Sequence, residues 1–307
     1  MEFQHYSVLE NEVIEALAVK AGGVYVDGTL GGAGHARRIC ELGGRLIGID
    51  RDMDAINVAK ERLERYGASI VYGNFSGIGL VLDDLNIAAI DGAILDLGVS
   101  SYQLDNPERG FSYRADNALD MRMDNAKGKT AADIVNGYEA SELARILAEY
   151  GEEKYANSIA RKIVQRRPIH TTFELVDVIK SAIPPKVRFA DKHPAKRTFQ
   201  AIRIEVNDEL GSLRMAIEAF AKRLAENGRL AIITFHSLED RIVKTEFERL
   251  VGGECSCPKG LPVCVCGAGD GGYRVVTRKP IVPSERELGE NSRSKSAKLR
   301  VLERVVV

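Results

Sequence analysis

Three segments of the chain carry glycines and carboxylates in a spacing that suits a nucleoside ligand. A β-branched run ends at Asp27 and is followed by the glycine-rich residues 28–34, while two further apolar runs end at Asp50 and Asp96. Glycine lets the backbone turn sharply and approach a ligand closely because no Cβ intervenes. A carboxylate that ends the second strand can accept hydrogen bonds from both ribose hydroxyls of an adenosine. These residues therefore predict a site for an adenosine-containing cofactor.

The spacing of the glycines separates two cofactors of this kind. Residues 28–34 do not match G-x-G-x-x-G, the pattern that brings a helix N-terminus onto a pyrophosphate. Residues 96–101 stand where methyltransferases place the loop that contacts their substrate beside the sulfonium. Both features favour S-adenosylmethionine. A nicotinamide-dependent dehydrogenase is the alternative from another enzyme class, and a cofactor-binding titration separates the two.

The hydrophobic pattern predicts the elements that position these residues. Short β-branched runs alternate with amphipathic helices, which is typical of a parallel sheet covered on both faces. Strands are expected at residues 24–27, 45–50, 69–72, 92–97, 229–235, 273–278 and 297–305. The pair Ser7 and Glu10 is predicted to form a capping box that begins the first helix, and Asn227-Gly228 to end the helix before the fifth strand.

Helix signals replace strand signals in the middle of the chain, where a second capping box stands at Thr171 and Glu174. We therefore predict an α/β fold. Its Rossmann-like methyltransferase core has a mostly parallel sheet with helices on both faces and comprises residues 1–105 and 212–307. Residues 106–211 are predicted to form an inserted, all-helical domain for substrate recognition.

Charge is segregated along the chain, although the formal net charge is only −1. Residues 154–203 hold twelve Lys and Arg against three acidic residues, and residues 271–307 hold nine against four. Such segregation is typical of nucleic-acid binders, and solvated helix faces are the alternative explanation. No apolar run approaches the ~18–20 residues that span a bilayer, and no signal peptide is recognised. A cytoplasmic, non-membrane protein is expected, with its oligomeric state left open.

Four of the five cysteines form a C-x-C-x6-C-x-C cluster, namely Cys255, Cys257, Cys264 and Cys266. In a reducing compartment such a cluster suggests a metal before disulfides, so a structural zinc is a hypothesis here, with no catalytic metal. Cys40 stands alone and is expected to be a small buried hydrophobe.

Seven longer runs closely resemble the bacterial 16S ribosomal RNA (cytosine-N4)-methyltransferases of the MraW family. They include V-D-G-T-L-G-G-A-G-H at residues 26–35 and L-D-L-G-V-S-S-Y-Q-L-D at residues 95–105; the others are residues 109–112, 119–124, 199–207, 234–241 and 283–300. The resemblance covers essentially the whole chain. It implies methyl transfer from S-adenosylmethionine to N4 of a cytidine in the decoding centre of 16S rRNA, within the small ribosomal subunit, and an inserted helical domain that recognises RNA.

The resemblance also implies roles for individual residues. Carried over by position, the cofactor pocket comprises Gly32, Ala33, Gly34, His35, Asp50, Phe75, Asp96 and Gln103. Residues 33–35 would contact the methionine end, Asp50 the ribose and Phe75 the adenine. Ala33 stands where many relatives have glycine, which is tolerated unless the residue needs a positive φ.

The loop that follows Asp96 lacks the prolines and the aromatic residue found in many amino-methyltransferases. Our hypothesis is that Asp96, with the Ser100 hydroxyl or a carbonyl of residues 97–99, accepts a hydrogen bond from the target amine. His236 is an alternative proton acceptor or a cap of the next helix, and His193 is expected to touch phosphate or solvent.

The target base must be unstacked to reach the pocket. Tyr102, Phe111 and Tyr113 are candidates to stack on it, and membership of the domain junction is the competing explanation for each. A non-enzymatic RNA-binding ribosome-assembly protein is a second alternative function. The intact glycine loop, Asp50 and Asp96 argue against it.

Overall fold

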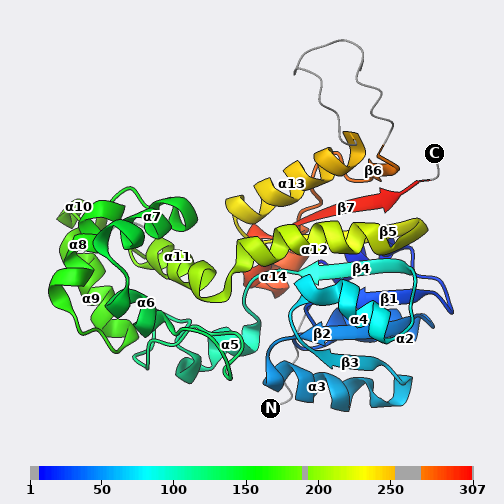
Figure 1. The fold of residues 1–307 in the computed structure, drawn as a ribbon, viewed down its shortest axis with the longest axis horizontal. Helices are drawn as coiled ribbons and strands as arrows, with labels where there is room; N and C mark the ends of the chain where they lie inside the picture. Colours follow the sequence, from blue (N-terminus) through cyan, green and yellow to red (C-terminus); the bar gives the residue numbers. More distant parts are fainter. Residues whose placement is uncertain (1–6, 189–192, 253–270, 306–307) are drawn as a thin grey trace, which may run out of the picture. The chain divides into compact units, whose positions relative to one another are not determined.

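The computed structural model describes residues 7–188, 193–252 and 271–305, and it divides into two compact units. The first unit comprises residues 1–98 and 210–307, and the second comprises residues 99–209 (Figure 1). The first unit therefore ends at Gly98 rather than at residue 105, because the short helix α5 (Ser101–Asp105) belongs to the second unit.

A seven-stranded sheet forms the centre of the first unit, in the order β3-β2-β1-β4-β5-β7-β6. The strands from β1 to β5 are parallel, whereas β7 runs antiparallel to both β5 and β6. Their bounds are β1 (Val24–Asp27), β2 (Arg45–Asp50), β3 (Ser69–Tyr72), β4 (Ile90–Asp96), β5 (Leu224–Thr234), β6 (Tyr273–Val275) and β7 (Lys298–Arg304). The predicted α/β fold with a mostly parallel sheet is confirmed.

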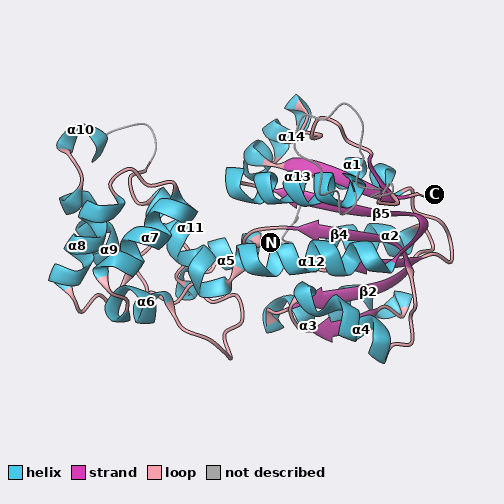
Figure 2. Ribbon diagram, turned by 45° about the horizontal axis from the view of Figure 1, so that its top comes forward, coloured by secondary structure: helices cyan, strands magenta, loops and turns pink. Residues whose placement is uncertain are grey.

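Helices cover both faces of this sheet (Figure 2). Apolar side chains of α1 (Glu10–Leu17), α2 (Gly34–Glu41) and α3 (Met53–Leu63) pack with Tyr25, Ile94 and Val301 in one core cluster. The neighbouring residue Arg300 points to the other face, where its Nε donates to Asp240 of α13 (Ser237–Gly252) at 2.7 Å. The unit also contains α4 (Ile78–Asp84), α12 (Glu209–Arg223), α14 (Glu285–Glu290) and the 3-10 turns η1 (Glu64–Tyr66), η2 (Phe75–Gly77) and η4 (Ser292–Ser296).

Two local predictions about helix ends are wrong. Ser7 does not cap α1: the N-cap is Leu9, with φ of 53° and no side-chain bond, and Glu10 instead lies 3.3 Å from Arg38 Nε. Helix α12 ends at Arg223, before Asn227-Gly228, because Leu224 already pairs with Ile90 of β4. The Asn-Gly pair lies inside β5, where the register with β4 is irregular.

The second unit is helical. Its elements are α5, η3 (Pro107–Arg109), α6 (Ala131–Gly137), α7 (Ala140–Gly151), α8 (Ala156–Arg166), α9 (Thr172–Ala182), α10 (Pro185–Arg188) and α11 (Lys196–Asn207). Leu143, Ile159, Leu175 and Ile202, one from each of four helices, lie in its common core. The capping box at Thr171 is present, since its side chain accepts from the backbone N–H of Glu174 and the Glu174 carboxylate accepts in return. Among the described residues, no helix is long and apolar enough to cross a membrane.

Candidate active site

The predicted carboxylates lie at one edge of the sheet. Asp27, Asp50 and Asp96 are the last residues of β1, β2 and β4, which are adjacent parallel strands. Strand β1 lies between β2 and β4, where the chain order of the strands reverses. In open α/β sheets, ligands bind outside the carboxyl ends of the strands at such a switch point.

The glycine loop is tied to the strands on both sides of β1. Gly28 N–H donates to the carbonyl of Ile94 at 3.0 Å, and Leu30 N–H donates to the carbonyl of Ile49 at 3.2 Å. A Cβ added at Gly28 would stand 2.5 Å from Leu95 Cδ2 and 3.0 Å from Phe75 Cβ. Glycine is therefore required here by packing of the loop against β4 and against Phe75.

Ala33 has a left-handed backbone, with φ of 60° and ψ of 27°, and is the N-cap of α2. This is the condition under which an alanine is strained, because its Cβ crowds the following carbonyl in the left-handed region. The next residue, Gly34, has no room for a side chain, because an added Cβ would lie 1.8 Å from Ser7 Oγ. The start of α2 is thus closed by residues that precede α1.

His35 is buried, and its Nε2 lies 2.9 Å from the carbonyl oxygen of Val8. Nε2 therefore carries a hydrogen and donates it, because a carbonyl can only accept. The imidazole ties α2 to the segment before α1. Because Nε2 is used in this bond, the predicted cofactor contact of His35 would be made by its backbone.

The Asp50 carboxylate holds the loops on both sides of it. Oδ2 accepts from Gly31 N–H and Oδ1 accepts from Asp52 N–H, each at 2.9 Å. Burial raises the pKa of this carboxyl group, and the two backbone donors counteract part of that rise. Each carboxylate oxygen has a further lone pair, so the group can still accept from two ribose hydroxyls.

Phe75 is buried immediately after β3 and begins η2. Asn74 caps this turn by accepting from Ser76 N–H at 3.0 Å, and its amide donates to Ser212 Oγ at 3.1 Å. A Cβ added at Gly28 would stand 3.0 Å from Phe75 Cβ, so Phe75 lies beside the glycine loop. This position suits the flat face of an adenine.

Asp96 carries the feature that points most directly to a ligand. Its Oδ1 is buried and has no hydrogen-bond partner among the described residues. Burial, followed by the charges of Asp27, Glu239 and Glu287, raises the pKa of Asp96 to about 8. Native proteins rarely leave a buried polar atom unpaired, so an orphaned carboxylate oxygen at a strand end indicates a missing donor or cation.

Asp27 was not among the predicted site residues. Its position at the end of a β-branched run, directly before the glycine loop, could have identified it. It is almost fully buried, and burial raises its pKa to about 7, with Asp50 contributing and hydrogen bonds from Thr29 opposing. The first unit therefore gathers three strand-end carboxylates around the glycine loop. Carboxylate acceptors, an aromatic wall and an orphaned oxygen fit the hydroxyl, ammonium and sulfonium groups of S-adenosylmethionine.

Ser100 and Gln103 belong to the second unit. The Ser100 hydroxyl accepts from Gln103 N–H at 3.2 Å, and Gln103 Oε1 accepts from Ser100 N–H at 3.0 Å. Together they form the capping box of α5. The Ser100 oxygen is therefore used to begin a helix, and its second lone pair and its hydroxyl hydrogen are left for another partner.

The aromatic candidates for base stacking differ in exposure. Phe111 lies in the core of the second unit, and Tyr113 stacks on His193 at 4.3 Å between ring centroids and meets Phe199 edge-on. Tyr102 is 49% exposed. His193 packs on Tyr113, its Nδ1 accepts from Ala195 N–H, and burial lowers its pKa. The residue is partly exposed, and its contact with phosphate or solvent stays a prediction.

His236 caps helix α13. Its Nδ1 accepts from Glu239 N–H at 3.4 Å, and Glu239 Oε2 accepts from the N–H groups of Phe235 and His236. Nε2 lies 3.1 Å from Glu239 Oε1, without the geometry of a hydrogen bond. The structure thus supports the capping explanation. The spacing of His236 and Glu239 in the sequence H-S-L-E is that of a reciprocal helix cap.

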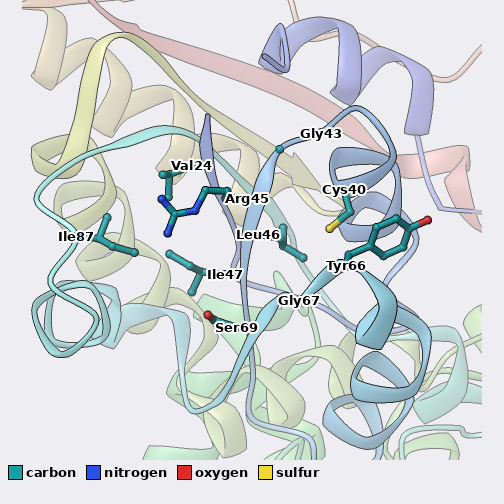
Figure 3. Close-up of a pocket in the computed structure, with 11 residues that line it drawn as sticks. Val24, Cys40, Gly43, Arg45, Leu46, Ile47, Tyr66, Gly67, Ser69 and Ile87 are labelled. Carbon is teal, nitrogen blue, oxygen red and sulfur yellow. The ribbon is translucent and has the colours of Figure 1, made fainter. Parts of the chain in front are cut away.

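A cavity of about 280 Å³ lies at the opposite edge of the sheet (Figure 3). It is lined by the amino-terminal starts of strands, including Val24, Arg45 and Ser69, and by the buried Cys40. None of the predicted site residues reaches it, so it is separate from the carboxyl-end site. The cysteines predicted to hold zinc lie outside the described residues, and zinc stays a hypothesis.

A parallel sheet with a glycine loop at the strand-order switch, flanked by strand-end acids, defines a Rossmann-like methyltransferase core of class I. The chain belongs to the MraW methylase family, whose model matches residues 2–305. The chain is 55% identical over 313 residues to ribosomal RNA small subunit methyltransferase H of Lachnospira eligens, covering 99% of each protein. It is 54% identical over 313 residues to the protein of the same name from Geobacter sp. strain M21, again with 99% of each covered. A solved putative methyltransferase from Streptococcus mutans, in complex with SAH, shares 12% identity and a TM-score of 0.46, over 98% of this chain and 100% of that one.

Proposed function

We propose that this protein transfers a methyl group from S-adenosylmethionine to the exocyclic N4 of a cytidine in the decoding centre of 16S rRNA. Membership of the MraW methylase family and the names of the relatives, which act on small-subunit ribosomal RNA, support this assignment. The observation that carries the chemistry is the buried, unpartnered Oδ1 of Asp96 at the end of β4. A cytoplasmic location belongs to the same proposal, and the substrate is either naked 16S rRNA or this rRNA within the small subunit.

The cofactor would be held by residues around the carboxyl ends of β1 and β2. Gly32, Ala33, Gly34 and His35 would line the methionine end, Asp50 would accept from the ribose hydroxyls, and Phe75 would pack on the adenine. Gln103 of the second unit would complete the pocket. When bound, S-adenosylmethionine supplies a methyl group on a positively charged sulfur. N4 would take this methyl group as its bond to sulfur breaks.

Asp96 is the proposed proton acceptor. The cytosine amine is a poor nucleophile because its lone pair is delocalised into the ring, and its proton becomes acidic as N4 is alkylated. Burial raises the pKa of Asp96 to about 8 in the cofactor-free protein, so the group must first lose its own proton. Its carboxylate is then a stronger base than an exposed one, and the positive charge of a bound sulfonium would favour the ionised form. The orphaned Oδ1 of Asp96 is the proposed acceptor atom. Ser100, whose hydroxyl oxygen keeps a second lone pair beside its helix cap, is proposed as a second acceptor for the amine.

Exchange of Asp96 for asparagine tests this role. Asn keeps the shape but cannot take up a proton, so kcat of Asp96→Asn should fall by about 10²–10⁴-fold, the usual contribution of general base catalysis. The assay uses labelled cofactor and small subunits that lack the modification, followed by mapping of the modified nucleotide. Asp84→Asn, at an exposed position of α4, is the matched control and should keep its turnover. Full turnover of Asp96→Asn would exclude the acceptor role.

The cysteine cluster is proposed as a structural zinc site on its sequence alone. Metal analysis of protein purified without chelators tests it, and protein that contains no zinc would exclude the site.

A further inference from the structure

The ends of β1 and β4 are connected by the side chain of Thr29. Its Oγ1 accepts from the backbone N–H of Asp96 at 2.6 Å. The same hydroxyl lies 3.5 Å from Asp27 Oδ1, to which it donates, and the Thr29 backbone N–H donates to that oxygen at 3.0 Å. One hydroxyl thus links the buried carboxylate of Asp27 to the backbone of Asp96.

This connection replaces a bond that the sheet does not supply. Asp27 and Ile94 are the last paired residues of β1 and β4, and Asp96 lies two residues farther along β4. The chain after Asp27 turns away into the glycine loop, so no strand residue of β1 faces Asp96. The Thr29 hydroxyl takes the place of the missing carbonyl acceptor.

The consequence concerns the position of the Asp96 carboxylate. Because Asp96 Oδ1 has no partner within the described part of the chain, its position depends on where the backbone of Asp96 is fixed. A displacement of about 1 Å in a reacting group can lower a rate by about 10²-fold. Small movements at the end of β4 should therefore affect turnover strongly.

We infer that Thr29 is a positioning residue for methyl transfer: its hydroxyl, oriented by Asp27, fixes the backbone of Asp96 and thereby its free carboxylate oxygen. The inference rests on the proposed role of Asp96. Thr29 needs no contact with cofactor or RNA to act in this way. The interaction therefore predicts an effect on turnover that is larger than the effect on cofactor affinity.

Three threonine variants test the inference. Thr29→Val keeps the shape and removes the hydroxyl, whereas Thr29→Ser keeps the hydroxyl. Thr198→Val is the control, because Thr198 is a buried threonine whose hydroxyl has no partner among the described residues. In Thr29→Val, kcat should fall by about 10–100-fold while the KM for S-adenosylmethionine changes by less than about 3-fold, and Thr29→Ser should restore kcat to within about 3-fold.

Amide hydrogen exchange at Asp96, followed by NMR, reports the bond itself without any turnover. Exchange should be faster in Thr29→Val than in Thr29→Ser and Thr198→Val. Unchanged exchange, unchanged kcat, or equal losses of kcat and cofactor affinity in Thr29→Val would each overturn the inference. If Asp96→Asn turns over normally, the proposed acceptor role fails, and the exchange rates still show whether Thr29 holds the end of β4.

Discussion

Asp27 and Asp96 are desolvated carboxyl groups whose ionisation opposes folding. Burial raises their pKa values to about 7 and about 8 in the folded protein. In the unfolded chain an Asp has a pKa of about 3.9. Between these values the folded state binds more protons than the unfolded state, so the free energy of unfolding decreases as pH rises. The stabilisation is complete below about pH 4 and is lost as pH rises through about 7 and 8.

Asp96→Asn should weaken this pH dependence in the cofactor-free protein. Each such group contributes a slope of at most about 1.4 kcal/mol per pH unit, and the asparagine variant lacks one of the two groups. Urea unfolding at about pH 5 and about pH 8 measures the difference in each variant. The wild type should lose more stability over this interval than Asp96→Asn, and Asp84→Asn should behave like the wild type. Identical slopes for all three proteins would contradict the assigned charge state.

At the scale of elements, the beginning of α2 is the most constrained part of the cofactor site. Ala33 is buried with a left-handed backbone, so glycine there would relieve about 1–2 kcal/mol of strain and lose about 0.8 kcal/mol of methyl burial. These opposing effects are similar in size. The net cost of alanine is therefore only about 0.2–1.2 kcal/mol, which the fold can tolerate.

Gly34→Ala should destabilise the protein more than an exchange of Ala33 for glycine, because the new Cβ would lie 1.8 Å from Ser7 Oγ. Overpacking of this kind costs about 1–3 kcal/mol, which exceeds the gain from alanine in a helix. We expect a lower unfolding midpoint and weaker S-adenosylmethionine binding by calorimetry. Ser7→Ala removes the colliding atom, so the double variant should recover both properties. Absence of recovery would show that the N-terminal segment does not close this site.

At the scale of the whole molecule, the basic residues of the helical unit divide into two groups. Arg167 donates to the carbonyls of Val135 and Tyr138, and Arg203 donates to Glu209 at 2.8 Å, so both serve the fold. The side chains of the other group form neither a hydrogen bond nor an ion pair with the described residues, and the group includes Lys154, Lys162, Arg166, Lys180, Lys186 and Lys196. These side chains are available to phosphates.

Neutralising two of them on α8, Lys162→Gln with Arg166→Gln, should weaken RNA binding and reduce its salt dependence. Each lost phosphate contact lowers the slope of log K against log salt by about 0.7–0.9. The control is Lys20→Gln with Lys60→Gln, which removes the same charge from exposed positions of the first unit. Filter binding to the rRNA fragment over a salt series measures both. Equal slopes for the two variants would place the RNA on another surface.

The sequence by itself determined the fold class, the strands that carry Asp50 and Asp96, and the family, which the match over residues 2–305 confirms. These features depend on local pattern: β-branched runs, glycine spacing and long irregular strings appear in the order of the chain. The site residues proposed from that family stay predictions.

Only the tertiary structure decided what depends on partners distant in sequence. The pairing of Leu224 with Ile90 ended α12 early, and the contact between Glu10 and Arg38 accompanies a first helix that Ser7 does not cap. The hydrogen bond from Asp96 to Thr29 forms because β1 and β4, distant in sequence, are neighbours in the sheet. The raised pKa of Asp96 arises from its burial in the same place. Desolvation and long-range hydrogen bonds have no local sequence pattern, so the chain revealed which acids could act, and the fold determined their surroundings and charge.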